Sequence, residues 1–214
     1  MQQHLIVGGE MESVFGIAPK SWECDMAATL DPQTKTSQSV PKLCVFGAGL
    51  VGQAVAYIAP LAGFRVLVVD DRKTFANRDR LPHVDEIKVC PFEQAVDEIE
   101  MDQKTFVVIM THKHRWDFDI LAKVLQRPTA YVGLMGSRGK IEKTFYALKK
   151  DGFTECELSR VCAPIGLDIG GNAPGEIAIS IVAQMIHVRY RQGKATEKWD
   201  PEKEYVPWDV LLRG

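Results

Sequence analysis

From Lys42 onward, apolar residues gather in short runs separated by longer stretches of helical length. The six runs lie at residues 43–46, 64–69, 85–89, 105–110, 130–134 and 161–162. Runs of this length with few polar residues are typical of strands that are buried on both faces of a parallel sheet. The pattern therefore predicts an α/β fold, a doubly wound parallel sheet with strand order 3-2-1-4-5-6 and right-handed crossovers.

The stretches between these runs predict the helices. They are expected at residues 50–62, 92–99, 117–125, 139–150 and from Pro174 onward. Pro60 is expected to kink or end the first helix, because proline lacks the N–H group that a helix interior requires. The apolar stretch 177–188 of the last helix is too short to span a bilayer and contains polar residues, so it predicts a buried or interface helix.

Three parts of the chain differ in character. Residues 1–40 end in a polar stretch with turn-forming residues and are interpreted as an N-terminal extension or linker. Residues 41–193 contain the regular strand and helix pattern and form one domain. Residues 194–214 carry aromatic side chains in a polar setting, and we expect this tail to dock on the domain or on a second copy of the chain.

Composition narrows the class of protein. The chain has 214 residues, a formal net charge of −2, and 46% hydrophobic residues, which is ordinary for a globular protein and argues against nucleic-acid binding. The five cysteines form no C-x-x-C pair, so neither a zinc ribbon nor a disulfide framework is predicted. The N-terminus does not read as a signal peptide. We therefore expect a soluble, cytoplasmic protein that binds no membrane.

A glycine-rich turn directly follows the first strand. In this G-x-G-x-x-G sequence, Gly47 would permit the tight turn, Gly49 the approach of a phosphate, and Gly52 close packing of the helix. The start of the helix would offer N–H groups to an anion. Asp70 ends the second strand, where an acidic residue typically binds a ribose hydroxyl. The turn indicates a Rossmann-like domain, although the glycines could serve the turn alone.

The loop after the fourth strand contains Thr111, His112, His114 and Asp117. Ligands of such sheets bind beyond the carboxyl ends of the strands, near the change of strand order between the first and fourth strands. Contact with a polar ligand is therefore expected here. Metal binding is less favoured, because no set of three or four ligands is apparent.

The loops after the fifth and sixth strands also contain candidate residues. Gly136, Ser137, Arg138 and Lys140 suit an anion, especially a phosphate, although a plain helix cap with solvated cations is the alternative. The loop after the sixth strand is rich in glycine and contains two further candidates, Gly166 and Asp168. It predicts a shaped pocket wall, or a rigid turn in which Asp168 is a local cap.

These loops, in this order behind the glycine turn, resemble the Rossmann domain of the XdhC/CoxI family, the xanthine dehydrogenase accessory factors. The matching stretches are VFGAGLVGQAVA, FRVLVVDDR, VVIMTHKHRWDFDIL, YVGLMGSRGKIEKTF and APIGLDIGGNAPGEIAISIVAQ. The resemblance implies a dimeric maturation factor that binds molybdenum cofactor, in its molybdopterin or dinucleotide form. It also implies that the factor assists sulfuration, with a cysteine desulfurase as a further partner, and delivers the cofactor to a molybdenum hydroxylase.

The sequence departs from this family in two places. The family's glycine turn commonly reads G-A-G-H-V, whereas this chain has Leu50 at the position of the histidine. The family also carries a fuller N-terminal domain, of which residues 1–40 could be only a remnant. Two other functions stay open on the residues alone: an NAD(P)-dependent oxidoreductase, and a dimeric nucleotide or redox sensor without catalysis.

Overall fold

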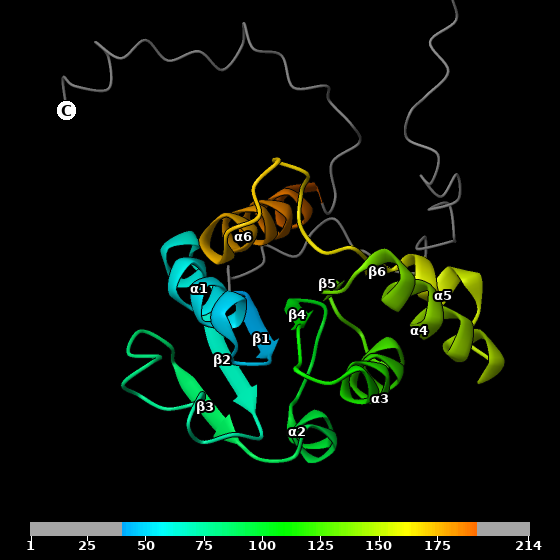
Figure 1. The fold of residues 1–214 in the computed structure, drawn as a ribbon, viewed down its shortest axis with the longest axis horizontal. Coiled ribbons are helices and arrows are strands. Elements are labelled where there is room, and N and C mark those ends of the chain that lie inside the picture. The colour runs from blue at the N-terminus through cyan, green and yellow to red at the C-terminus, as the bar shows by residue number, and fades with distance from the viewer. Residues whose placement is uncertain (1–39, 192–214) are drawn as a thin grey trace, which may run out of the picture. The chain divides into compact units, whose positions relative to one another are not determined.

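The computed structural model of the chain describes residues 40–191, apart from the side chains of His114 and Arg115. The expected N-terminal extension and C-terminal tail fall outside these residues. All strands of the described domain run parallel in one six-stranded sheet, with the order β3-β2-β1-β4-β5-β6 (Figure 1). They are β1 (Lys42–Phe46), β2 (Arg65–Asp70), β3 (Glu86–Val89), β4 (Thr105–Ile109), β5 (Tyr131–Leu134) and β6 (Val161–Cys162). The predicted Rossmann-like fold and its strand order are confirmed.

The helices are α1 (Leu50–Ile58), the 3-10 turn η1 (Ala59–Ala62), α2 (Phe92–Glu98), α3 (His114–Leu125), α4 (Arg138–Lys150), α5 (Glu155–Ser159) and α6 (Pro174–Arg191). Helix α1 ends just before Pro60, as the missing N–H of proline requires. Helix α5 was not expected. Its Thr154 and Glu157 form a reciprocal capping box, a signal that the sequence T-E-C-E offers at this position.

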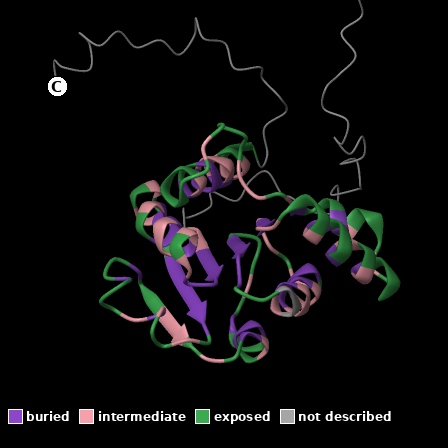
Figure 2. Cartoon of the chain, in the orientation of Figure 1, coloured by how far each residue is buried: buried purple, intermediate pink, exposed green. Residues whose placement is uncertain are grey.

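The sheet separates two apolar layers. Helices α1 and α6 cover one face, and helices α2, α3 and α4 cover the other (Figure 1). Because alternate residues of a strand point to opposite faces, Leu43 and Val45 join the core beneath α1 and α6, whereas Cys44 and Phe46 join the core beneath α2 and α3. Strands β1, β2 and β4 are therefore almost wholly buried (Figure 2). This burial explains their uninterrupted apolar runs in the sequence.

No helix within residues 40–191 has both the length and the apolar character needed to cross a bilayer.

Candidate functional site

The glycine turn packs tightly on one side and is open on the other. Gly47 has φ +115°, and a Cβ atom there would lie 2.4 Å from the carbonyl oxygen of Met110 at the end of β4. A Cβ atom at Gly52 would lie 2.0 Å from the carbonyl oxygen of Gly47. At Gly49, by contrast, a Cβ atom would meet nothing within 4 Å. Close packing thus requires Gly47 and Gly52, while the space beside Gly49 is free for a ligand.

Helix α1 begins at this turn without a side-chain cap. Gly49 is its N-cap residue, and no side chain accepts a hydrogen bond from the first turn. Free N–H groups and the positive end of the helix dipole therefore face the carboxyl edge of the sheet. Leu50, at the first helical position, is 70% exposed and contributes no polar group. The donors that this turn offers to an anion are therefore backbone N–H groups.

Asp70 is fully buried under the same turn. Its carboxylate accepts the N–H of Ala48 at 2.7 Å and the backbone N–H of Arg72 at 3.0 Å. The Arg72 guanidinium donates two further hydrogen bonds, at 2.9 and 3.0 Å, and lies over the ring of Phe75 at 4.0 Å. In this arrangement Asp70 fastens the glycine turn to β2. The ribose contact expected of Asp70 would require displacement of Arg72.

The Asp70–Arg72 pair predicts a dependence of stability on pH. Burial raises the pKa of Asp70, but hydrogen bonds from Arg72 and Ala48 and the charge of Arg72 together hold it below its ordinary value. A carboxyl group with a lowered pKa stabilises the fold above its unfolded pKa, and this stability is lost as the pH falls through the folded pKa. Chemical denaturation should therefore show a loss of stability beginning near pH 4. Arg72→Met should reduce that loss, and equal pH profiles of the two proteins would contradict the prediction.

A second buried carboxylate joins the loops after β4 and β5. Asp117, in the first turn of α3, is fully buried. One of its oxygens accepts the N–H of Thr111 at 3.1 Å and the hydroxyl of Thr111 at 2.7 Å. The other lies 2.5 Å from Nζ of Lys140 in α4. The structure thus brings three of the expected site residues together, and the charge of Lys140 is balanced by Asp117.

His112 lies beside Asp71 and Phe92. Its Nδ1 is 3.8 Å from a carboxylate oxygen of Asp71, and its ring is 6.5 Å from that of Phe92. Asp70, Asp71 and His112 place one potential ligand atom each within 4.8 Å of one another. Both oxygens of Asp70 already accept hydrogen bonds, and the guanidinium of Arg72 lies 3.7 Å from Asp71, so its charge would repel a metal ion. The side chain of His114 falls outside the described residues.

Helix α4 presents a second open N-terminus at the same edge. Ser137 is its N-cap residue, and no side-chain capping bond is formed. The Arg138 side chain is exposed and makes no ion pair with another described residue. Gly136 has little room, since a Cβ atom there would lie 2.8 Å from Cδ of Lys140. The predicted anion loop contains two cations. Arg138 is therefore the one that is available to a ligand, whereas Lys140 forms the ion pair with Asp117.

Side chains of α6 form hydrogen bonds with the loop after β6 on both sides of the exposed segment of that loop. Gly166 has φ +97°, and its backbone N–H and carbonyl groups both bond the side-chain amide of Gln184 in α6. Glu176 accepts the N–H groups of Asn172 and Ala173, at 2.9 Å each. Between these points Asp168 is exposed, and it accepts the N–H of Gly170 at 3.2 Å, as a local cap. This bond leaves the Asp168 carboxylate accessible at the carboxyl edge.

Three residues with structural roles were not predicted from the sequence: Arg72, which follows β2 at this edge, and the pair Tyr131 and Gln184, which supports the loop after β6. The signal for Gln184 was a lone amide within an apolar helix. Cys162, which ends β6, borders the same region. Burial raises the pKa of its thiol, and a hydrogen bond with Tyr131 only partly offsets that rise, which disfavours the thiolate form.

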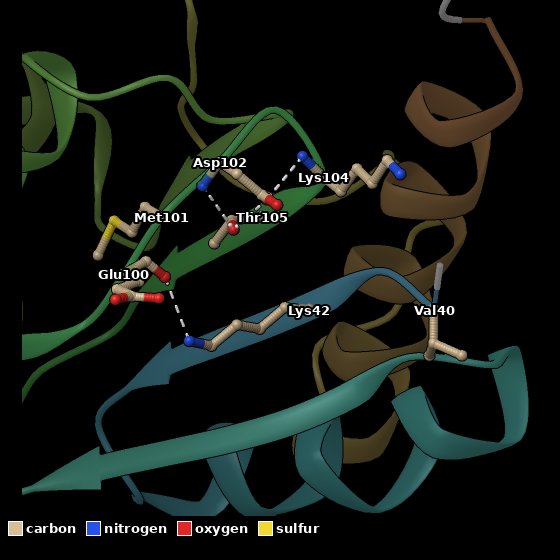
Figure 3. A pocket seen from close by; sticks show the side chains of 7 residues that line it. All are labelled: Val40, Lys42, Glu100, Met101, Asp102, Lys104 and Thr105. Carbon is tan, nitrogen blue, oxygen red and sulfur yellow. Dashed lines mark hydrogen bonds between the residues drawn. The ribbon is translucent and has the colours of Figure 1, made fainter. Parts of the chain in front are cut away.

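A cavity of about 610 Å³ lies at the opposite edge of the sheet, where β1 and β4 begin. Its lining residues are Val40, Lys42, Glu100, Met101, Asp102, Lys104 and Thr105 (Figure 3). Lys42 donates to the carbonyl oxygen of Glu100 at 3.2 Å, and Asp102 accepts from Thr105 at 2.8 Å. The cavity contains none of the candidate residues of the carboxyl edge.

Comparison with known proteins agrees with this architecture. Residues 43–185 match the sequence model of the XdhC Rossmann domain. The chain is 33% identical over 150 residues to the uncharacterised protein YqeB of Escherichia coli (strain K12), a match that covers 70% of this chain and 27% of that protein. It is 30% identical over 151 residues to a probable xanthine dehydrogenase subunit of Bacillus subtilis (strain 168), covering 71% of this chain and 44% of the relative.

A solved structure shows the same relationship. The crystal structure described as a xanthine dehydrogenase from Bacillus halodurans aligns with a TM-score of 0.65 at 30% identity, over 74% of this chain and 45% of that chain. The chain thus spans less than half the length of each of these relatives. The family match covers the glycine turn and all three loops at the carboxyl edge. The chain therefore belongs to the XdhC family, and its described domain is the Rossmann domain of that family.

Proposed function

We propose that this chain is an accessory factor for a molybdenum hydroxylase of the xanthine dehydrogenase type and that it binds molybdenum cofactor as its cargo. Family membership supports the accessory role, and the names of the Bacillus relatives, a probable xanthine dehydrogenase subunit and a xanthine dehydrogenase, support an association with an enzyme of that type. The observation that supports cargo binding is the pair of uncapped helix N-termini, at Gly49 and Ser137, on one edge of the sheet.

The residues at this edge fit a molybdopterin. Its phosphate requires N–H donors and a cation, which the open turn at Gly49, the start of α4 and Arg138 supply. Its flat pterin carries polar edges, for which His112 and Asp168 offer hydrogen-bonding groups. Thr111, Asp117 and Lys140 are bonded to one another and hold the loops after β4 and β5 together. When bound, the cofactor would supply the molybdenum centre that the client enzyme uses in catalysis.

The proposal extends to the partners of this step. The cargo would be sulfurated while bound and then delivered to the hydroxylase. Burial raises the pKa of the Cys162 thiol, so we assign the supply of sulfur to a separate cysteine desulfurase. A homodimer working in the cytoplasm completes the proposal, and the oligomeric state can be measured by light scattering.

Purification of the full chain from cells that synthesise molybdopterin tests the central claim. Mass spectrometry of the released ligand should identify molybdopterin or its dinucleotide form, and the same preparation from cells unable to make it should lack that mass. A folded protein that retains no cofactor in the first host would overturn the proposal. Saturable NADH or NADPH binding with hydride turnover would instead support an oxidoreductase, which the occupied carboxylate of Asp70 disfavours.

Charge reversal at Arg138 provides a residue-level test. If the guanidinium contacts the phosphate, Arg138→Glu should weaken cofactor binding by about 1.5–3 kcal/mol, which is about tenfold or more. Lys143→Glu makes the same change of charge at an exposed position further along α4 and is expected to bind nearly as the parent does. Equal affinities of the two variants, measured by titration, would remove Arg138 from the site.

A further inference from the structure

The amide of Gln184 makes an unusual set of contacts for one side chain. Its Oε1 accepts the N–H of Gly166 at 2.9 Å and the hydroxyl of Tyr131 at 2.5 Å. Its Nε2 donates to the carbonyl oxygen of Gly166 at 3.3 Å. Both backbone groups of Gly166 are therefore bonded to a side chain of α6, 18 residues further along the chain. Tyr131, from β5, is only 3% exposed and fixes the orientation of that amide.

Gly166 is the point at which the loop turns from the sheet toward α6. Its φ of +97° belongs to a region that side chains other than glycine rarely adopt. A Cβ atom there would also lie 2.4 Å from the hydroxyl of Ser180. On either side, Ile165 donates to the carbonyl of Leu134 at 3.1 Å and Leu167 donates to the carbonyl of Ser180 at 3.3 Å. Gln184 holds the turn between these two backbone bonds.

General stability does not explain a glutamine at this position. The buried face of α6 is mostly apolar: Ala178, Ile181 and Met185 are fully buried against the sheet, and the one buried hydroxyl, that of Ser180, bonds the helix's own backbone. A polar side chain on such a face is unfavourable unless its hydrogen bonds are satisfied. The hydrogen bonds of the Gln184 amide go to Gly166 and Tyr131, so this side chain satisfies the backbone N–H and carbonyl groups of the loop at Gly166. The loop places Asp168 two residues later at the carboxyl edge.

We propose that Gln184, oriented by Tyr131, is a positioning residue that fixes the loop after β6 in the conformation that receives the cargo. The inference rests on the proposed function for the identity of that cargo. Gln184 itself does not touch the ligand. It acts through Gly166, because a loop that is ordered before binding loses less conformational entropy when the ligand arrives.

Two measurements on the full chain test this role, one of them independent of the cargo. Gln184→Met keeps the length of the side chain and removes its three hydrogen bonds. Hydrogen exchange of peptides spanning residues 163–170, without ligand, should become about tenfold faster, as expected from the loss of hydrogen bonds at Gly166. Titration with molybdenum cofactor should show an affinity lowered by about five- to tenfold. The control is His187→Met on the same helix, an exposed position one turn further along, and it should leave both measurements unchanged.

The outcomes separate the inference from the proposed function. Unchanged exchange in a folded Gln184→Met protein would overturn the inference, whatever the cofactor does. Faster exchange with unchanged affinity would also overturn it, since a loop of no consequence for binding needs no positioning. Failure of the parent protein to bind cofactor would overturn the proposed function alone.

If Gln184→Met does not fold, Tyr131→Phe takes its place. This variant should accelerate exchange of the same peptides about threefold, because the Gln184 amide loses one of its three hydrogen bonds, and unchanged exchange would again be decisive against the inference.

Discussion

Gly52→Ala is expected to destabilise the domain by about 3 kcal/mol, whereas Gly49→Ala, three residues earlier, is expected to cost less than about 1 kcal/mol. A Cβ atom at Gly52 would lie 2.0 Å from the carbonyl oxygen of Gly47, a contact that only a shift of the helix or turn can relieve. At Gly49 the same atom would meet nothing within 4 Å, and φ is −67°, which alanine adopts freely. Chemical denaturation of both variants at neutral pH measures the difference.

The same pair of variants separates structure from binding. If a phosphate approaches the backbone at Gly49, Gly49→Ala should reduce cofactor affinity about tenfold while its fold remains intact, because a methyl group would occupy the space of the ligand. If Gly52→Ala and Gly49→Ala are equally stable, the turn can shift far enough to accommodate a Cβ atom at residue 52. An unchanged affinity of Gly49→Ala would place the phosphate elsewhere, with the start of α4 as the next position to test.

Lys140→Met should cost about 3 kcal/mol of unfolding free energy. Asp117 is fully buried, and the Lys140 ammonium is its ion-pair partner at 2.5 Å. Removal of one member of a buried pair leaves the other charge without compensation, which is more costly than loss of the pair as a whole. The Lys140 side chain is 14% exposed, so its screening by water is limited. Lys143→Met, an exposed position on the same helix, should change the stability by less than about 0.5 kcal/mol.

A double-mutant cycle identifies the origin of this loss. Asp117→Asn removes the buried negative charge and keeps an oxygen that can accept from Thr111. We expect the Asp117→Asn/Lys140→Met protein to be more stable than Lys140→Met alone, because the uncompensated charge is gone. Strict additivity of the two single changes would show that the pair contributes nothing beyond its separate side chains.

Most of the helices were predictable, and the exceptions have physical causes. Helix α3 begins at His114 rather than at 117, since Lys113 takes the N-cap position and its carbonyl accepts the N–H of Trp116. Most residues of this loop are polar, so the sequence has no helical spacing of apolar residues that would mark the first residue of α3. Helix α5 is five residues long, too short for a hydrophobic period, and only its capping box marks it in the sequence.

The order of residues along the chain was enough to predict the sheet, its strand order and the edge at which the candidate loops meet. Buried parallel strands must be apolar along their whole length, and right-handed crossovers leave few ways to order them. The pairing of charged groups, by contrast, became clear only from the folded arrangement. Asp70 binds Arg72 and Asp117 binds Lys140, and Arg138 is left exposed. Asp117 and Lys140 lie on separate helices, and spacing along the chain does not contain the short distance between their side chains. Asp70 and Arg72 are two residues apart, but only the fold shows that the buried Asp70 carboxylate is bonded to the Arg72 guanidinium.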